Sequence, residues 1–150
     1  MTLADYLGSE QAREDVRRAI RELATCDGLA YGIDFGWMRA GIIGAWRRVA
    51  VEQGQGAERI MTTAYYRPDG ERFVVTDLGE GVRAACLRGL DLANTEHFDR
   101  LNALGRTLDD DFRQTAPLGW IELRDVKPAD LPDALCRVML ASLKVAEVQP

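Results

Sequence analysis

The run Thr76-Asp77-Leu78-Gly79-Glu80 holds the residues best placed to do chemistry. It follows a β-rich run and precedes a helical pattern, so it predicts a sharp turn with two carboxylates at the start of a helix. A carboxylate at that position either caps the helix amides or takes part in acid–base chemistry. Asp77 therefore fits two predictions, a structural cap and a functional carboxylate.

His97 is the only histidine of the chain and would serve as the general base of an enzyme built around Asp77 and Glu80. No residue near it in the sequence supplies a partner, and its neighbours are apolar at helical spacing. A packed or capping side chain is our first interpretation of His97. A small enzyme with a carboxylate site at Asp77 and Glu80 stays an alternative.

Other chemistries lack their motifs. The three cysteines, Cys26, Cys86 and Cys136, are widely spaced and form no Cys-x-x-Cys pair, which indicates small buried thiols in a reducing cytosol. Asp34-Phe35-Gly36 matches the metal-binding tripeptide of kinases, but the other kinase motifs and every phosphate-binding glycine loop are missing. We therefore predict no metal and no cofactor.

Acidic residues gather in one segment. The chain has a formal net charge of -5, and the segment from Asp91 to Asp111 has 6 acidic and 2 basic residues, a net charge of -4. Such a field repels phosphate backbones and attracts basic surfaces. The sequence therefore predicts a protein partner with a basic surface, such as a nucleoprotein complex, and disfavours direct nucleic-acid binding.

The predicted partner-binding surface combines these acids with aromatic anchors, because tryptophan and tyrosine dominate the binding energy of protein interfaces. Its residues are Glu96, Asp99, Asp109, Asp110 and Asp111, with Trp37, Tyr66 and Trp120 as anchors.

A second cluster has the residue types that bind nucleic acid. Arg39, Arg47 and Arg48 lie close in sequence to Trp37 and Trp46, and arginine with tryptophan can hold phosphates and stacked bases. The net charge opposes this use, so a nucleic-acid-binding module is a further alternative.

Several elements must position these residues. Ser9 to Ala24 predicts a helix with Ser9 as its cap, and Trp46 to Val51 predicts a strand that ends at a polar glycine loop. A helix over Met38 to Ala50 is a weaker alternative, because Gly41 and Gly44 disfavour it.

The clearest element is a hairpin. Two β-rich runs, Arg59 to Arg67 and Glu71 to Asp77, flank Pro68-Asp69-Gly70, where proline presets the turn and glycine accepts a positive φ. A helical pattern follows Asp77 and ends near Gly89.

The C-terminal half reads mainly as helical. Thr95 to Leu108 predicts a helix with Thr95 as its cap, residues 112–119 a connection, Trp120 to Leu123 a short strand and Asp130 to Val148 a terminal helix. The sum is an α+β fold, with an N-terminal helix, a small antiparallel sheet and C-terminal helices packed on that sheet.

Size and composition support one domain over residues 1–150, because the chain is 47% hydrophobic and long enough to bury a core. No apolar stretch is long enough to cross a membrane and no secretory signal is visible, so we expect a cytoplasmic protein. A homo-oligomer stays open.

The strand–Thr-Asp-x-Gly–helix run, here Thr76, Asp77 and Gly79 with Gly89 downstream, resembles an uncharacterised domain family of phage and mobile-element proteins. Its usual second acid is replaced by Leu78. In size and acidity the chain is also similar to small inhibitors of host defence such as anti-CRISPR proteins. These resemblances imply a non-enzymatic interaction module that inhibits a host complex by occlusion, which is our leading expectation.

Overall fold

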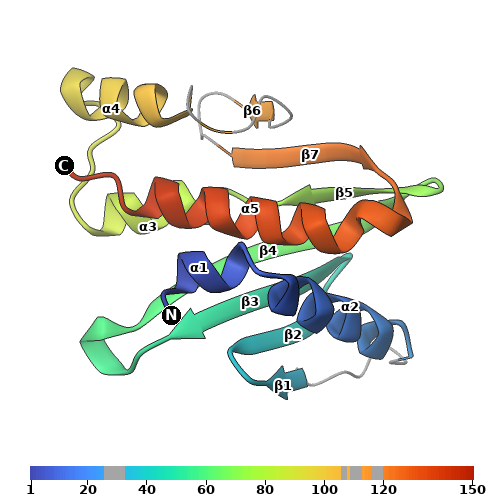
Figure 1. Cartoon of the computed structure of the whole chain (residues 1–150). Coiled ribbons are helices and arrows are strands. Elements are labelled where there is room, and N and C mark those ends of the chain that lie inside the picture. Colours follow the sequence, from blue (N-terminus) through green and yellow to red (C-terminus); the bar gives the residue numbers. More distant parts are fainter. Residues whose placement is uncertain (26–32, 106–107, 109–112, 116–119) are drawn as a thin grey trace.

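The computed structural model describes residues 1–25, 33–105, 108, 113–115 and 120–150. In this part of the chain, helices pack on one twisted antiparallel sheet (Figure 1), which confirms the predicted α+β class. The strands are β1 (Ile33–Phe35), β2 (Met38–Ile43), β3 (Trp46–Gln53), β4 (Ile60–Asp69), β5 (Arg72–Thr76), β6 (Arg113–Thr115) and β7 (Trp120–Val126). The helices are α1 (Leu3–Leu7), α2 (Glu10–Ala24), α3 (Glu80–Leu87), α4 (Thr95–Gly105) and α5 (Leu131–Ala146).

The sheet has seven strands in the order β1-β2-β3-β4-β5-β7-β6. Consecutive strands from β1 to β5 pair as antiparallel hairpins, and β7 then adds beside β5. The predicted hairpin joins β4 to β5, and Gly70 has the positive φ of 65° that a tight turn requires. The turn itself is Gly70-Glu71, because Pro68 and Asp69 still belong to β4 and pair with Phe73 and Arg72, so the predicted role of Pro68 in the turn is corrected.

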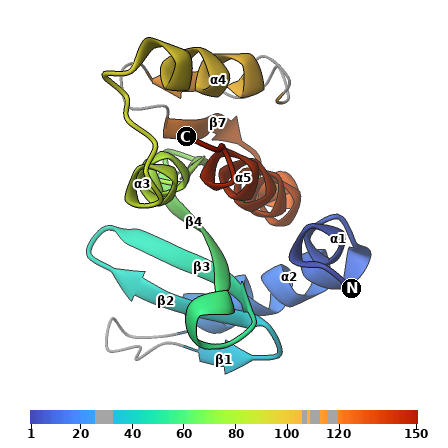
Figure 2. The same ribbon diagram turned by 90° about the vertical axis from the view of Figure 1, so that its left-hand side faces the viewer.

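One face of the sheet carries the core. The side chains of alternate residues, such as Val49, Val51 and Ala64, point to this helix face and pack with α1, α2 and α5. Buried Thr62 also points this way and donates a hydrogen bond of 2.6 Å to the Met139 carbonyl of α5. Figure 2 shows α1 and α5 to one side of β4 and α3 to its other side, where Glu80 of α3 accepts a hydrogen bond from Tyr65.

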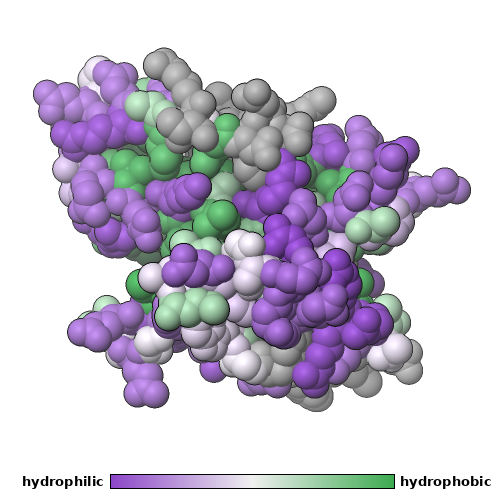
Figure 3. Space-filling model, in the orientation of Figure 1, coloured by the Kyte–Doolittle hydropathy of each residue, from purple (hydrophilic) through white to green (hydrophobic). Residues whose placement is uncertain are grey.

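The helices begin where polar caps are available. The Ser9 hydroxyl accepts from the Ala12 amide at the start of α2, as the sequence predicted. Arginine and glutamate residues cover the exposed side of α2, and this part of the surface is hydrophilic in Figure 3. Pro132 lies in the first turn of α5, where no amide is needed for a helical bond.

The predicted strand over Trp46 to Val51 is confirmed as part of β3. The weaker alternative, a helix over Met38 to Ala50, is excluded, because this stretch forms the β2–β3 hairpin with Gly44 at a positive φ of 59° in its turn. Three other details of the predicted elements were wrong. Part of the predicted connection forms β6, and β7 extends beyond Leu123 to Val126. Asn94, not Thr95, caps α4, since its side-chain oxygen accepts from the two amides that follow Thr95.

Candidate functional site

Asp77 lies at the corner between β5 and α3, and its side chain is 0% exposed. Its Oδ1 accepts from the amides of Gly79 at 2.9 Å and Ile121 at 3.1 Å. Its Oδ2 accepts from the Gly81 amide at 3.1 Å and the Ser142 hydroxyl at 2.8 Å. One carboxylate thus ties the corner to β7 and α5, which supports the capping interpretation.

The backbone conformation around this corner allows α3 and α5 to approach each other closely. Leu78 and Gly79 both have positive φ, 53° and 76°, and together they reverse the chain between β5 and α3. A Cβ at Gly81 would lie only 2.7 Å from the Ser142 carbonyl oxygen. Glycine at position 81 therefore lets α3 touch α5.

Burial raises the pKa of the Asp77 carboxyl, while its four hydrogen bonds act in the opposite direction. No acceptor site faces solvent, because the side chain is enclosed. A substrate would have to displace an internal bond to reach Asp77.

The other two residues of the enzyme alternative have separate partners. Glu80 accepts a hydrogen bond of 2.6 Å from the Tyr65 hydroxyl. His97 accepts one of 2.9 Å from the Asp91 amide through Nδ1, which caps the turn before α4. These contacts do not join Asp77, Glu80 and His97 into one hydrogen-bonded catalytic group.

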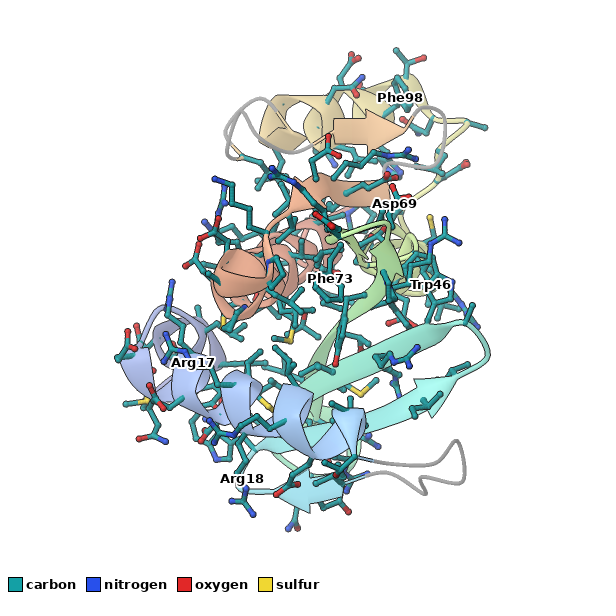
Figure 4. The ribbon with its side chains drawn as sticks, turned by 90° about the vertical axis from the view of Figure 1, so that its right-hand side faces the viewer. Arg17, Arg18, Trp46, Asp69, Phe73 and Phe98 are labelled. Atoms are coloured by element: carbon teal, nitrogen blue, oxygen red, sulfur yellow. The ribbon has the colours of Figure 1, made fainter. Side chains whose placement is uncertain are left out.

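The acidic surface is described only in part. Glu96 and Asp99 are exposed on α4, and between them Phe98 is 40% exposed (Figure 4). Glu96 lies 3.9 Å from Arg100, a weak surface pair. Asp109, Asp110 and Asp111 lie outside the described residues, so their part of the surface stays a prediction.

Two of the three predicted aromatic anchors are not free. Tyr66 is only 4% exposed, because its register places it on the helix face of the sheet, and its role as a surface anchor is corrected. Trp37 is half-buried and packs edge-on against Tyr6, with ring centroids 5.0 Å apart. Trp120 begins β7, and its side chain lies outside the described part.

The predicted arginine cluster is divided by the sheet. Arg39 and Arg48 lie on the outer face, opposite α5, whereas Arg47 has the parity of the helix face beside Tyr66. Trp46 is on the outer face with Arg48, while Trp37 packs on the helix side. The structure therefore brings together Arg39, Arg48 and Trp46 but separates Arg47 and Trp37 from them.

The outer face adds two residues that the sequence reasoning missed. The Arg67 guanidinium carbon lies 4.7 Å from the centre of the Trp46 ring, and the Tyr65 ring meets Trp46 edge-on at 6.5 Å. Arg48 pairs with Tyr65 in register. We call these four residues, Trp46, Arg48, Tyr65 and Arg67, the arginine–tryptophan surface, although Tyr65 is only 7% exposed and supports the Trp46 ring without being a contact residue itself. Figure 4 shows Trp46 on the side of the sheet away from α5.

The charges of this surface are unevenly compensated. Arg39 is paired with Asp34 at 3.4 Å and with Glu52 at 3.0 Å. Among the described residues, neither Arg48 nor Arg67 has a carboxylate within ion-pair distance. The Arg48 Nε atom is also buried without a hydrogen-bond partner in the described part.

The pKa of Tyr65 is consistent with its hydrogen bond to Glu80. Burial and the bond to Glu80 raise the pKa of Tyr65 to about 12, and the positive charge of Arg48 acts against this shift. The Tyr65 hydroxyl therefore stays a donor at neutral pH and holds Glu80 against the strand.

Few residues in the described part of the chain could support metal or thiol chemistry. No group of three or more histidine, cysteine, aspartate or glutamate side chains there is placed to hold a metal ion. Cys86 and Cys136 are free thiols, and burial raises the pKa of Cys136 to about 12. Cys26 lies outside the described residues.

No protein-family model, curated protein or solved structure matches this chain. Within the described residues, none of the helices has both the length and the apolar character needed to cross a bilayer.

Proposed function

We propose that the protein is a binding module that acts by occupying the surface of a partner protein, and that the arginine–tryptophan surface is its contact site. The observation that carries this proposal is the pair of uncompensated guanidinium groups, Arg48 and Arg67, beside the half-buried ring of Trp46. Tryptophan, tyrosine and arginine are the residues that most often dominate interface energies.

The positive charge of the arginine–tryptophan surface determines which kind of partner it can bind. Arg48 and Arg67 attract carboxylates, because a guanidinium group and a carboxylate form charge-assisted hydrogen bonds. A short acidic protein segment fits better than a nucleic acid, because the net charge of -5 repels an extended phosphate backbone, with its many negative charges, more strongly than a segment with few carboxylates. Inhibition of a host complex, and a phage or mobile-element origin, rest on the sequence resemblance alone.

A second candidate contact, the acidic side of α4, would take a basic partner. The specific observation in its favour is the exposed Phe98 between two acids, Glu96 and Asp99. Charge reversal of both acids to lysine tests this candidate. Slower association at low salt supports it, and an unchanged association rate excludes the described part of α4.

The primary proposal is tested by affinity capture from the native cell with mass spectrometry, using the full chain and two variants of equal charge change. Arg67→Glu alters the contact site, whereas Arg21→Glu alters the exposed end of α2. A true partner is retained by wild type and by Arg21→Glu, is lost with Arg67→Glu, and presents an acidic segment. Equal retention by both variants, or no retained protein, contradicts the proposal.

A further inference from the structure

A groove of about 270 Å³ adjoins the arginine–tryptophan surface. It lies between the start of β4, one side of α3 and the last turns of α5. Glu80 belongs to both features, because it lines the groove and accepts the Tyr65 hydroxyl. Glu80 therefore links the groove to the arginine–tryptophan surface.

The walls of the groove are largely apolar. Met61 contributes from β4, Ala84 and Leu87 from α3, and Ala146 from α5. Leu87 is 79% exposed and Met61 is 43% exposed, and clustered large apolar side chains at a surface mark sites of contact with other molecules. The volume lies below the range of about 300–1,000 Å³ typical of small-molecule sites, so it suits a side chain better than a cofactor.

Thr63 adds a polar group to the lining of the groove. A peptide backbone can form a hydrogen bond with a threonine hydroxyl, whereas a hydrocarbon ligand cannot.

We infer that this groove receives an aliphatic side chain from the same partner segment whose acidic residue contacts Arg67. The inference rests on the proposed function. Thr63 and Arg67 are four residues apart on β4, a separation of about 13 Å along the strand. An extended segment that follows β4 spans this distance with about four residues. The partner motif is therefore an acidic residue and a leucine, isoleucine or methionine four positions apart.

Selection of peptides tests this motif. A displayed library of random twelve-residue peptides is panned on the immobilised full chain, and retained peptides are synthesised and titrated by fluorescence polarisation. The expected peptides contain an acid and an aliphatic residue at the four-residue spacing.

Two variants and one control separate the two sites. Ala84→Trp fills the groove, and Leu87→Glu places a charge at its mouth at a position exposed enough to tolerate the change. Ala103→Trp adds the same bulk at an exposed site on α4. Each groove variant should weaken peptide binding about tenfold while Ala103→Trp binds as wild type does.

The outcomes distinguish the groove from the proposed function. Acidic peptides that lose affinity with Arg67→Glu but show no aliphatic preference, or bind both groove variants normally, overturn the groove and leave the proposed function standing. If no peptide is retained by wild type, both are overturned.

Discussion

Replacement of Asp77 is the sharpest perturbation that the fold offers. Asp77→Ala leaves three buried amides, those of Gly79, Gly81 and Ile121, without their acceptor. Each unsatisfied buried donor costs about 1–3 kcal/mol, so the variant should lose roughly 3–9 kcal/mol of unfolding free energy. That loss is comparable with the whole stability of a domain, about 5–15 kcal/mol.

Asp77→Asn should lower the stability less than Asp77→Ala does, because asparagine keeps part of the hydrogen bonding. The asparagine oxygen can serve the Gly79 and Ile121 amides at the Oδ1 position, and its NH₂ can donate to Ser142, but the Gly81 amide then faces a donor. One unsatisfied amide predicts a loss of about 1–3 kcal/mol.

Urea unfolding followed by circular dichroism at pH 7 measures all three proteins, and Asp99→Ala at an exposed position of α4 is the surface control. The expected order of stability is wild type, Asp77→Asn, Asp77→Ala. If Asp77→Ala unfolds within about 1 kcal/mol of wild type, the capping account of this corner is refuted and a functional role for the carboxylate gains support.

Three further predictions concern the same framework. Gly81→Ala should destabilise the protein by about 1–3 kcal/mol in urea unfolding, because its Cβ would meet the Ser142 carbonyl oxygen at 2.7 Å; a neutral effect would show that α3 and α5 are not in close contact. Tyr65→Phe removes the bond to Glu80 and should cost about 0.5–1.5 kcal/mol at pH 7. Since the pKa of Tyr65 is raised to about 12, its contribution to stability is complete below pH 10 and is lost as the pH rises through 12, so the gap between variant and wild type should close over that interval in urea titrations. Ser9→Ala should lower the thermal stability by the equivalent of about 0.5–2 kcal/mol, and an unchanged melting temperature would exclude the hydroxyl as the cap of α2.

Short sequence motifs predicted the elements that neighbouring residues define on their own. The Ser9 cap, the β4–β5 hairpin with Gly70 in its turn and the terminal amphipathic helix are all present, although Pro68 and Asp69 lie in β4 and not in the turn. The β2–β3 hairpin was harder to predict, since Gly41 and Gly44 disfavour a helix without defining a turn. The three residues of β6 carry no local pattern of their own, because the strand is defined by its pairing with β7.

The candidate site depends on register, which the sequence does not reveal. Arg47 and Arg48 are adjacent in sequence yet lie on opposite faces, because side chains alternate along β3. Arg67 meets Trp46 only because the β3–β4 pairing brings their strands together. Had the strand boundaries been known, the alternation of Arg48 with Trp46 and of Arg67 with Tyr65 would have placed all four residues on one face.

Calorimetric titration of the captured acidic partner into wild type, Arg67→Glu and Arg21→Glu tests the central claim most directly. Loss of about 2 kcal/mol, the threshold for a hot-spot residue, predicts affinity roughly 30-fold weaker for Arg67→Glu and unchanged for Arg21→Glu. Equal affinities for all three proteins would show that the arginine–tryptophan surface does not bind the partner.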